Sequence, residues 1–321
     1  MFLDSNLTLM QYIGLDKQIR KNNFNSVLLL IAFPALLLGM LYALVYFLQE
    51  EHGTDPNTLF LQSAPALLGA VGVWFLIAWA GHAVFIRMAT GSKTLDRKEN
   101  KRVYNLVENI CISQGMTMPK VYIIEDDSLN SFASGINNRS YSVSLSRGII
   151  NKLDDDELEG VIAHEITHIK NRDVRLLIVS IIFVGIFAFL AELAFRSLRF
   201  AGSGKKSKDS KGSGAIILIA IVITAIAYFI SILLRFGISR KREYLADAGA
   251  AEITKKPYAL AKALKKISGD PLIEAVESRD VAQLFIENPK PSAHKSASWD
   301  NLFATHPSIE KRIELLEQYV K

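Results

Sequence analysis

The sequence contains a single cysteine, Cys111, among its 321 residues. One thiol cannot form an internal disulfide framework, and it cannot supply the several cysteines of a Cys-rich zinc knuckle. We therefore expect Cys111 to act as a small buried apolar residue. Both the disulfide-stapled secreted domains and the Cys-rich zinc folds are excluded by this count.

Charge is also scarce, because charged residues make up 21% of the chain and hydrophobic residues 50%. An ordinary soluble domain is less apolar than this, so the composition predicts membrane segments. The formal net charge is +5. The lysines and arginines lie beside hydrophobic runs and in one short linker, where anionic lipid headgroups explain them better than nucleic acid does. We expect membrane lipid as a partner and no nucleic acid.

Four stretches contain almost no charge and are long enough to cross a bilayer, which takes about 20 apolar residues in a helix. The third is interrupted by Glu192, and no small-residue cleavage site follows the first, which we expect to remain as an uncleaved span. The four stretches are residues 27–48, 63–86, 176–195 and 215–234.

The basic residues that flank the first two spans predict the topology. Lys17, Arg20 and Lys21 precede the first span, and Arg87 and further cations follow the second. By the positive-inside rule both flanks are cytoplasmic, and so is the segment that continues to residue 173.

The linker at residues 201–214 is rich in Gly, Ser and Lys and is expected to be flexible. Its four lysines prefer the cytoplasmic side, in conflict with two full spans around it. Residues 174–234 therefore form either two spans, which we favour, or a partly inserted hairpin.

The rest of the chain is organised around residues 154–173, which contain His164-Glu165-Ile166-Thr167-His168, an HExxH pattern. Asp154 and Glu157 resemble a capping box, and an apolar face follows, so we expect a helix. The two histidines then share one face and can bind one metal ion. Glu165 lies beside that ion, where its carboxylate can take a proton from bound water and pass it to a leaving amine. Chance alone also produces this short motif in about one chain in a hundred of this length.

Residues 130–147 predict a β-hairpin that turns at Asn137-Asn138 and follows a short strand at residues 121–124. In the second arm Tyr141, Val143 and Leu145 alternate with serines, which is typical of a strand with one buried and one wet face. Such an edge strand could pair with an extended substrate backbone beside the metal. The spacing fits equally well with a hairpin that only completes the sheet.

A third metal ligand is predicted at Glu243, after the fourth apolar run. Glu243 and Asp247 are four residues apart on an expected helix and share a face. Two histidines and one carboxylate leave the fourth tetrahedral position to water, and Asp247 could accept the second ring N–H of a ligand histidine. The alternative is a solvated acidic face beside a basic cluster.

Taken together, the HEITH and EYLAD segments and the apolar hairpin between them resemble the HtpX-type membrane zinc metallopeptidases, which are related to the CAAX prenyl proteases. The resemblance covers nearly the whole chain. It implies one Zn²⁺ per chain bound by His164, His168 and Glu243, with Glu165 as the catalytic carboxylate. Asp247 would then contact a ligand and not the zinc itself.

Two further segments carry the resemblance. Asn130-Ser131-Phe132-Ala133 matches a family segment that commonly has Ala at the second position, and it implies substrate-binding roles for Asn130, Phe132 and Ala133. Thr305-His306-Pro307 precedes an expected helix with Pro307 in its first turn. There, resemblance to the CAAX proteases implies that His306 and Arg312 stabilise the oxyanion. For Arg312, a plain surface helix is nearly as good an interpretation.

The predicted fold class is an α+β membrane protein, with four transmembrane helices and a mostly helical zincin domain that carries a small β-sheet. Its parts are an N-terminal cytoplasmic segment (1–24), two spans (25–87), the first zincin part (88–173), the hairpin with its linker (174–234) and the second zincin part (235–321). The resemblance implies an endopeptidase of the bacterial inner membrane, with a cytoplasmic active site, that removes damaged or misfolded membrane proteins. CAAX endopeptidase activity and a non-catalytic zinc-binding scaffold are the alternatives.

Overall fold

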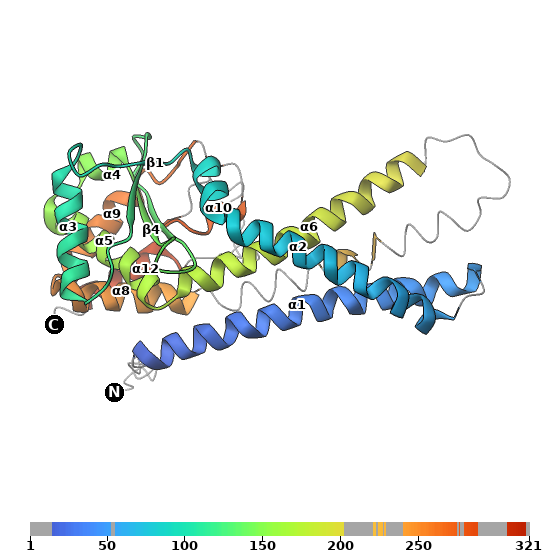
Figure 1. Cartoon of the computed structure of the whole chain (residues 1–321). Coiled ribbons are helices and arrows are strands. Elements are labelled where there is room, and N and C mark those ends of the chain that lie inside the picture. The colour runs from blue at the N-terminus through green and yellow to red at the C-terminus, as the bar shows by residue number, and fades with distance from the viewer. Residues whose placement is uncertain are drawn as a thin grey trace, which may run out of the picture.

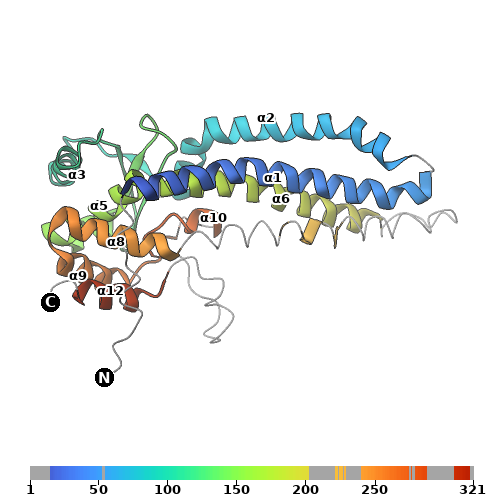
Figure 2. The ribbon, with the colours of Figure 1, turned by 90° about the horizontal axis from the view of Figure 1, so that it is seen from below.

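The computed structural model of the chain describes residues 15–52, 55–201, 221–222, 224–226, 228, 240–274, 276, 279–287 and 307–318. Three long helices lie side by side and extend away from an α+β domain at one end (Figures 1 and 2). They are α1 (Leu15–His52), α2 (Pro56–Thr90) and α6 (Asp173–Ala201).

These three helices are long and apolar enough to cross a membrane, over Ile19–Phe47, Pro56–Thr90 and Asp173–Leu193. They confirm the first three predicted spans. The predicted fourth span at 215–234 lies outside the described residues except at 221–222, 224–226 and 228, and so does nearly all of the predicted linker. Helix α1 begins at Leu15, within the predicted N-terminal segment 1–24.

Aromatic side chains hold the three membrane helices together. Phe33 of α1 stacks on Phe183 of α6 with ring centroids 4.8 Å apart, and Phe75 of α2 stacks on the same ring at 5.3 Å. On the outside of α2, large apolar side chains such as Leu76 and Ile77 are exposed. That distribution suits helices surrounded by lipid, which is as apolar as these side chains.

The sheet of the α+β domain has four strands in the order β1-β2-β4-β3. β2 and β4 are parallel, whereas the β1/β2 and β3/β4 pairs are antiparallel. The predicted hairpin is confirmed, since the Asn137 side chain accepts hydrogen bonds from the backbone N–H groups of Arg139 and Ser140 at the turn. The strands are β1 (Lys93–Thr94), β2 (Lys120–Ile124), β3 (Ser131–Ser134) and β4 (Ser142–Ser146).

The expectation of a wet serine face on β4 is wrong. Ser142, Ser144 and Ser146 are all buried, because β4 is an interior strand covered on both faces. Ser142 exchanges a hydrogen bond with the Ser134 hydroxyl across the hairpin, and Ser146 caps the next helix. Within the hairpin the edge strand is β3, where the backbone N–H of Ile286 donates to the carbonyl of Ser131.

Helix α5 (Asp155–Lys170) is the centre of the domain, packed against α8, α9 and β3. Its predicted capping box is present, with Asp154 and Glu157 each bonding the other's backbone N–H. Only Asn171 and Arg172 separate α5 from α6. The remaining helices are α3 (Lys101–Ser113), α4 (Arg147–Lys152), α8 (Arg240–Thr254), α9 (Pro257–Ile267), α10 (Arg279–Ala282) and α12 (Ile309–Gln318).

Candidate metal centre

His164 and His168 lie one turn apart on the buried face of α5, and their Nε2 atoms approach to 3.1 Å. The rings are nearly perpendicular, with centroids 4.7 Å apart. Glu243 on α8 faces both rings. Its carboxylate oxygens lie 3.5 Å from Nε2 of His164 and 3.6 Å from Nε2 of His168. The three predicted ligands are therefore brought together, with ligand atoms within 4.8 Å of one another.

A close approach of α8 to α5 makes this convergence possible. A Cβ on Gly249 would lie 2.5 Å from Cγ2 of Thr167, so no larger residue fits there without a shift of the Thr167 side chain or of one helix. Ala246 and Ala250 of α8 are fully buried. Small residues on α8 thus hold Glu243 beside the histidines.

Each histidine also has a carboxylate behind it. Nδ1 of His164 lies 2.9 Å from Oδ1 of Asp247, and Nδ1 of His168 lies 3.0 Å from Oδ2 of Asp173. A carboxylate at Nδ1 favours the tautomer with the proton on that atom and leaves the Nε2 lone pair as a ligand. Two such lone pairs only 3.1 Å apart cannot hydrogen-bond to each other. These residues therefore fit a divalent cation between the rings and Glu243.

The charges of the site favour a cation as well. Burial lowers the pKa of His164, but the carboxylates of Asp247 and Glu243 outweigh it and raise that pKa above the usual value. Burial likewise opposes protonation of His168, yet Glu243 and Asp173 raise its pKa to about 10. The carboxylates therefore make this buried site attractive to positive charge, whether carried by protons or by a metal ion.

Arg312 of α12 is fully buried and binds the Asp247 carboxylate. Its Nε and one terminal nitrogen donate to the two carboxylate oxygens of Asp247, each at 2.8 Å. The other terminal nitrogen donates to the carbonyl of Ile286 and lies 3.8 Å from Glu243. Burial raises the pKa of Asp247, but Arg312 outweighs it and lowers that pKa to about 2. Asp247 is therefore held as a carboxylate behind His164.

Glu165 is buried beside the histidines, and its Oε1 accepts a hydrogen bond of 2.7 Å from the hydroxyl of Ser131 on β3. Burial raises the pKa of Glu165, with the two neighbouring histidines opposing the shift. Glu165, His168 and Glu243 line a cavity of about 30 Å³. This is enough room for a water molecule. Val174 and Leu177, from the first two turns of α6, form part of its wall.

The predicted substrate-binding segment lies on β3 but is mostly covered. The Asn130 side chain donates to the carbonyls of Pro271 and Glu287, so it ties the strand to later segments. Phe132 is fully buried and packs on Phe285 with ring centroids 4.7 Å apart. Of the three predicted residues, Ala133 lines the cavity beside Glu165.

Two predictions at the end of the chain meet different outcomes. His306 lies outside the described residues. The helix expected to begin at Pro307 begins instead at Ile309, and the Ser308 carbonyl accepts the first backbone bonds from Lys311 and Arg312.

Sequence reasoning missed Asp173 as the partner of His168, although its place at the start of the next helix, five residues after that histidine, was a usable signal. It also missed Asn22 on α1, which donates to Oδ1 of Asp173 at 2.6 Å and to the carbonyl of Asn171. Nothing in the local sequence around Asn22 indicates this contact, because the two residues meet only after α1 packs on α6.

Comparison with known proteins places this site in a family. The model of peptidase family M48 matches residues 97–320. A "Protease HtpX homolog" of Bacteroides fragilis is 54% identical over 323 residues, covering 97% of this chain and 100% of the relative. Others from Thermoanaerobacter pseudethanolicus and Lactobacillus helveticus are 39% and 32% identical, covering 85% and 95% of this chain and 97% and 99% of their own. A crystal structure of S. mikatae Ste24p superposes with a TM-score of 0.47 at 19% identity, covering 94% of this chain and 67% of that one.

Proposed function

Because the chain belongs to peptidase family M48 and to its HtpX proteases, and is thus a membrane metalloprotease, we propose that it is a zinc-dependent endopeptidase of the bacterial inner membrane. Its active site faces the cytoplasm, which agrees with the cations that flank the first two spans. The proposed metalloprotease domain is formed by segments on both sides of the membrane hairpin, residues 88–173 and 235–321. Damaged or misfolded membrane proteins are the proposed substrates.

One observation carries the proposal. The Nε2 atoms of His164 and His168 converge with the Glu243 carboxylate, while Asp247 and Asp173 face the opposite ring nitrogens. Two nitrogens and one carboxylate with an open fourth position are the ligand set of catalytic zinc sites. A zinc ion bound there would polarise the scissile carbonyl and make water more acidic.

The side chains of this protein supply the other steps. Glu165 accepts a proton from the attacking water and delivers it to the nitrogen of the leaving amine. The Ser131 hydroxyl restrains Oε1 of Glu165 and so limits the positions that the carboxylate adopts. Asp247 and Asp173 hold the two imidazoles in the tautomer that keeps Nε2 available.

Arg312 receives a different role from the one expected. Because its guanidinium group bonds both oxygens of Asp247, we assign it to positioning Asp247 and, through it, His164. His306 remains the residue proposed to stabilise the oxyanion. Asn130 braces β3, and Ala133 is the residue of that strand best placed to contact substrate beside Glu165.

The substrate proposal is supported by the position of the cavity. Val174 and Leu177 belong to the first two turns of a membrane helix and also line the cavity beside the proposed ligands. Polypeptide that reaches the site therefore passes close to the membrane surface. Membrane proteins that have lost their native packing present such segments.

The test compares wild type with Glu165→Gln, both purified in detergent, for hydrolysis of an unfolded protein, with bound zinc quantified in each. We expect Glu165→Gln to keep its zinc and lose activity, and chelation to abolish wild-type activity until zinc is restored. Equal activity in both preparations, or inactive wild type with zinc fully bound, would overturn the proposal. A preference for farnesylated peptides over unfolded chains would instead indicate CAAX processing.

A further inference from the structure

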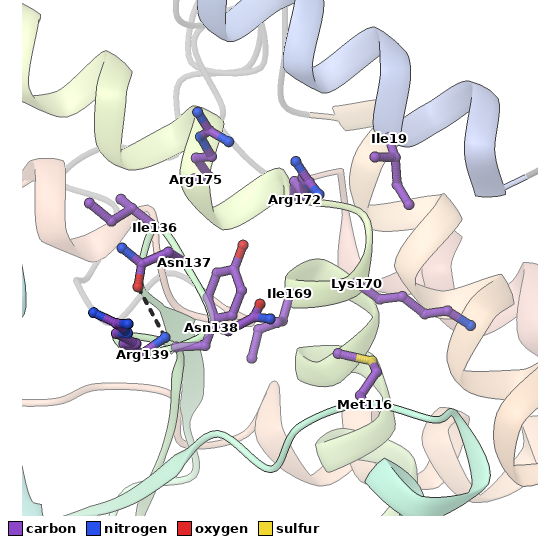
Figure 3. Close-up of a pocket in the computed structure, with 11 residues that line it drawn as sticks. Ile19, Met116, Ile136, Asn137, Asn138, Arg139, Ile169, Lys170, Arg172 and Arg175 are labelled. Carbon is purple, nitrogen blue, oxygen red and sulfur yellow. Dashed lines mark hydrogen bonds between the residues drawn. The ribbon is translucent and has the colours of Figure 1, made fainter.

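A second and larger cavity, of about 580 Å³, lies where the α+β domain meets the membrane helices (Figure 3). It shares no lining residue with the cavity at the metal centre. Its walls come from the start of α1, from the junction of α5 and α6 and from the tip of the β3–β4 hairpin. We call it the basic pocket because its lining includes Arg139, Lys170, Arg172 and Arg175.

Among the described residues that line the pocket, none is a carboxylate that could pair with these four cations. Lys170 donates to the neutral side chain of Gln114, and Arg172 donates to the neutral side chain of Asn23. Nε of Arg175 is buried and has no hydrogen-bond partner within the described part of the chain. The pocket therefore holds positive charge and a buried donor that the surrounding described residues do not satisfy.

Several cations elsewhere in the domain are paired with carboxylates. Elsewhere in the domain, Arg102 pairs with Asp155, Arg147 pairs with Glu125, and Lys256 pairs with Asp156. A buried donor without an acceptor costs free energy comparable to a lost hydrogen bond. An anion in the pocket would remove that cost at Arg175 and neutralise its neighbours.

The position of the pocket relative to the bilayer indicates which anion it binds. Ile19 is the first residue of one candidate span, and Arg175 lies in the first turn of another. Both residues line the pocket, so it lies where the helices enter the bilayer, at the depth of lipid phosphates. Apolar side chains of Ile19, Ile136 and Ile169 complete the lining and suit the less polar part of a lipid headgroup region.

We propose that the basic pocket binds the phosphate group of an anionic phospholipid. Guanidinium groups bind phosphate oxygens through paired, charge-assisted hydrogen bonds, and basic pockets between membrane helices on the cytoplasmic side bind lipid headgroups. Free phosphate offers the same oxygens. The phospholipid is favoured because its acyl chains can continue along α1 and α6, which free phosphate cannot do.

The experiment titrates detergent-purified protein with phosphatidylglycerol and counts bound lipid by native mass spectrometry. Phosphatidylcholine of the same chain length serves as the neutral lipid, and inorganic phosphate is the free-anion competitor. We expect wild type to bind phosphatidylglycerol selectively, and Arg139→Gln/Arg175→Gln to bind it about thirtyfold more weakly. Arg139→Gln alone, at an exposed turn that does not affect folding, should show an intermediate loss.

The matched control is Lys98→Gln/Lys120→Gln, which removes two exposed cations that do not line the pocket. It should bind phosphatidylglycerol as wild type does. Equal binding by all variants would overturn the proposal, and so would competition by inorganic phosphate as effective as that of the lipid. Unchanged lipid binding with weaker cleavage of acidic peptides by the pocket variant would instead make the pocket a substrate site.

Discussion

The hydroxyl of Ser131 donates a 2.7 Å hydrogen bond to Oε1 of Glu165 and so links the edge strand to the proposed general base. Replacing Ser131 by Ala removes this restraint without touching a metal ligand. We expect kcat to fall about three- to tenfold, with KM and zinc content unchanged, because the interaction acts through the orientation of Glu165. Ser134→Ala is the matched control, since Ser134 bonds Ser142 across the hairpin. An equal loss in the control would show a general effect on β3.

Asp247 and Arg312 form a buried pair behind His164. Asp247→Asn should lower zinc affinity about 10- to 100-fold, the usual cost of losing a carboxylate behind a ligand histidine. Arg312→Lys keeps the charge but loses the two parallel bonds, and we expect a loss of similar size that does not add to the first. Competition with a chelator of known affinity measures both. Additive losses would separate Arg312 from Asp247, and exposed Asp270→Asn should leave affinity unchanged.

The close approach of α5 and α8 gives a third prediction. Gly249→Ala places a methyl group 2.5 Å from Cγ2 of Thr167, so the Thr167 side chain or one of the two helices must shift. Overpacking of this kind typically costs about 1–3 kcal/mol of unfolding free energy, and here it also moves Glu243 away from the histidines. Adding Thr167→Ser removes the clashing methyl and should restore much of both losses. Gly69→Ala on α2, where nothing lies within 4 Å, is the control for stability measured by urea unfolding.

Labelling of the Cys111 thiol tests whether this residue is buried in the core of the folded domain. Burial raises the pKa of its thiol to about 11, so the reactive thiolate is a very small fraction at pH 8. We expect iodoacetamide to label the native protein slowly and the urea-unfolded protein rapidly. Because the chain has no other cysteine, all label reports this site. Rapid stoichiometric labelling of the native protein would contradict the buried position of Cys111.

Local patterns in the sequence predicted the elements whose causes are local. The capping box of Asp154 and Glu157 fixed the start of α5, the Asn137-Asn138 turn fixed the hairpin, and helical spacing placed His164 and His168 on one face. Length and apolar character predicted four membrane helices, and the described residues contain the first three of them.

The missed features arise only when distant segments pack. Whether the serines of β4 are wet depends on which strand lies at the sheet edge, and strand spacing says nothing of that order. The position of Arg312 behind Asp247 joins residues that are 65 positions apart. Asp173 received its partner through the short connection between α5 and α6, and Asn22 joined it across 151 positions.

The short connection between α5 and α6 also determines how close the candidate metal centre lies to the membrane. His168 and Asp173 are five residues apart across a two-residue turn, and Nδ1 of this predicted ligand lies 3.0 Å from the carboxylate of the first residue of a membrane helix. The polypeptide itself therefore holds the proposed metal centre close to the bilayer surface. Mapped cut sites should cluster within a few residues of the ends of substrate membrane helices, and bonds in stable domains held away from the bilayer should be spared.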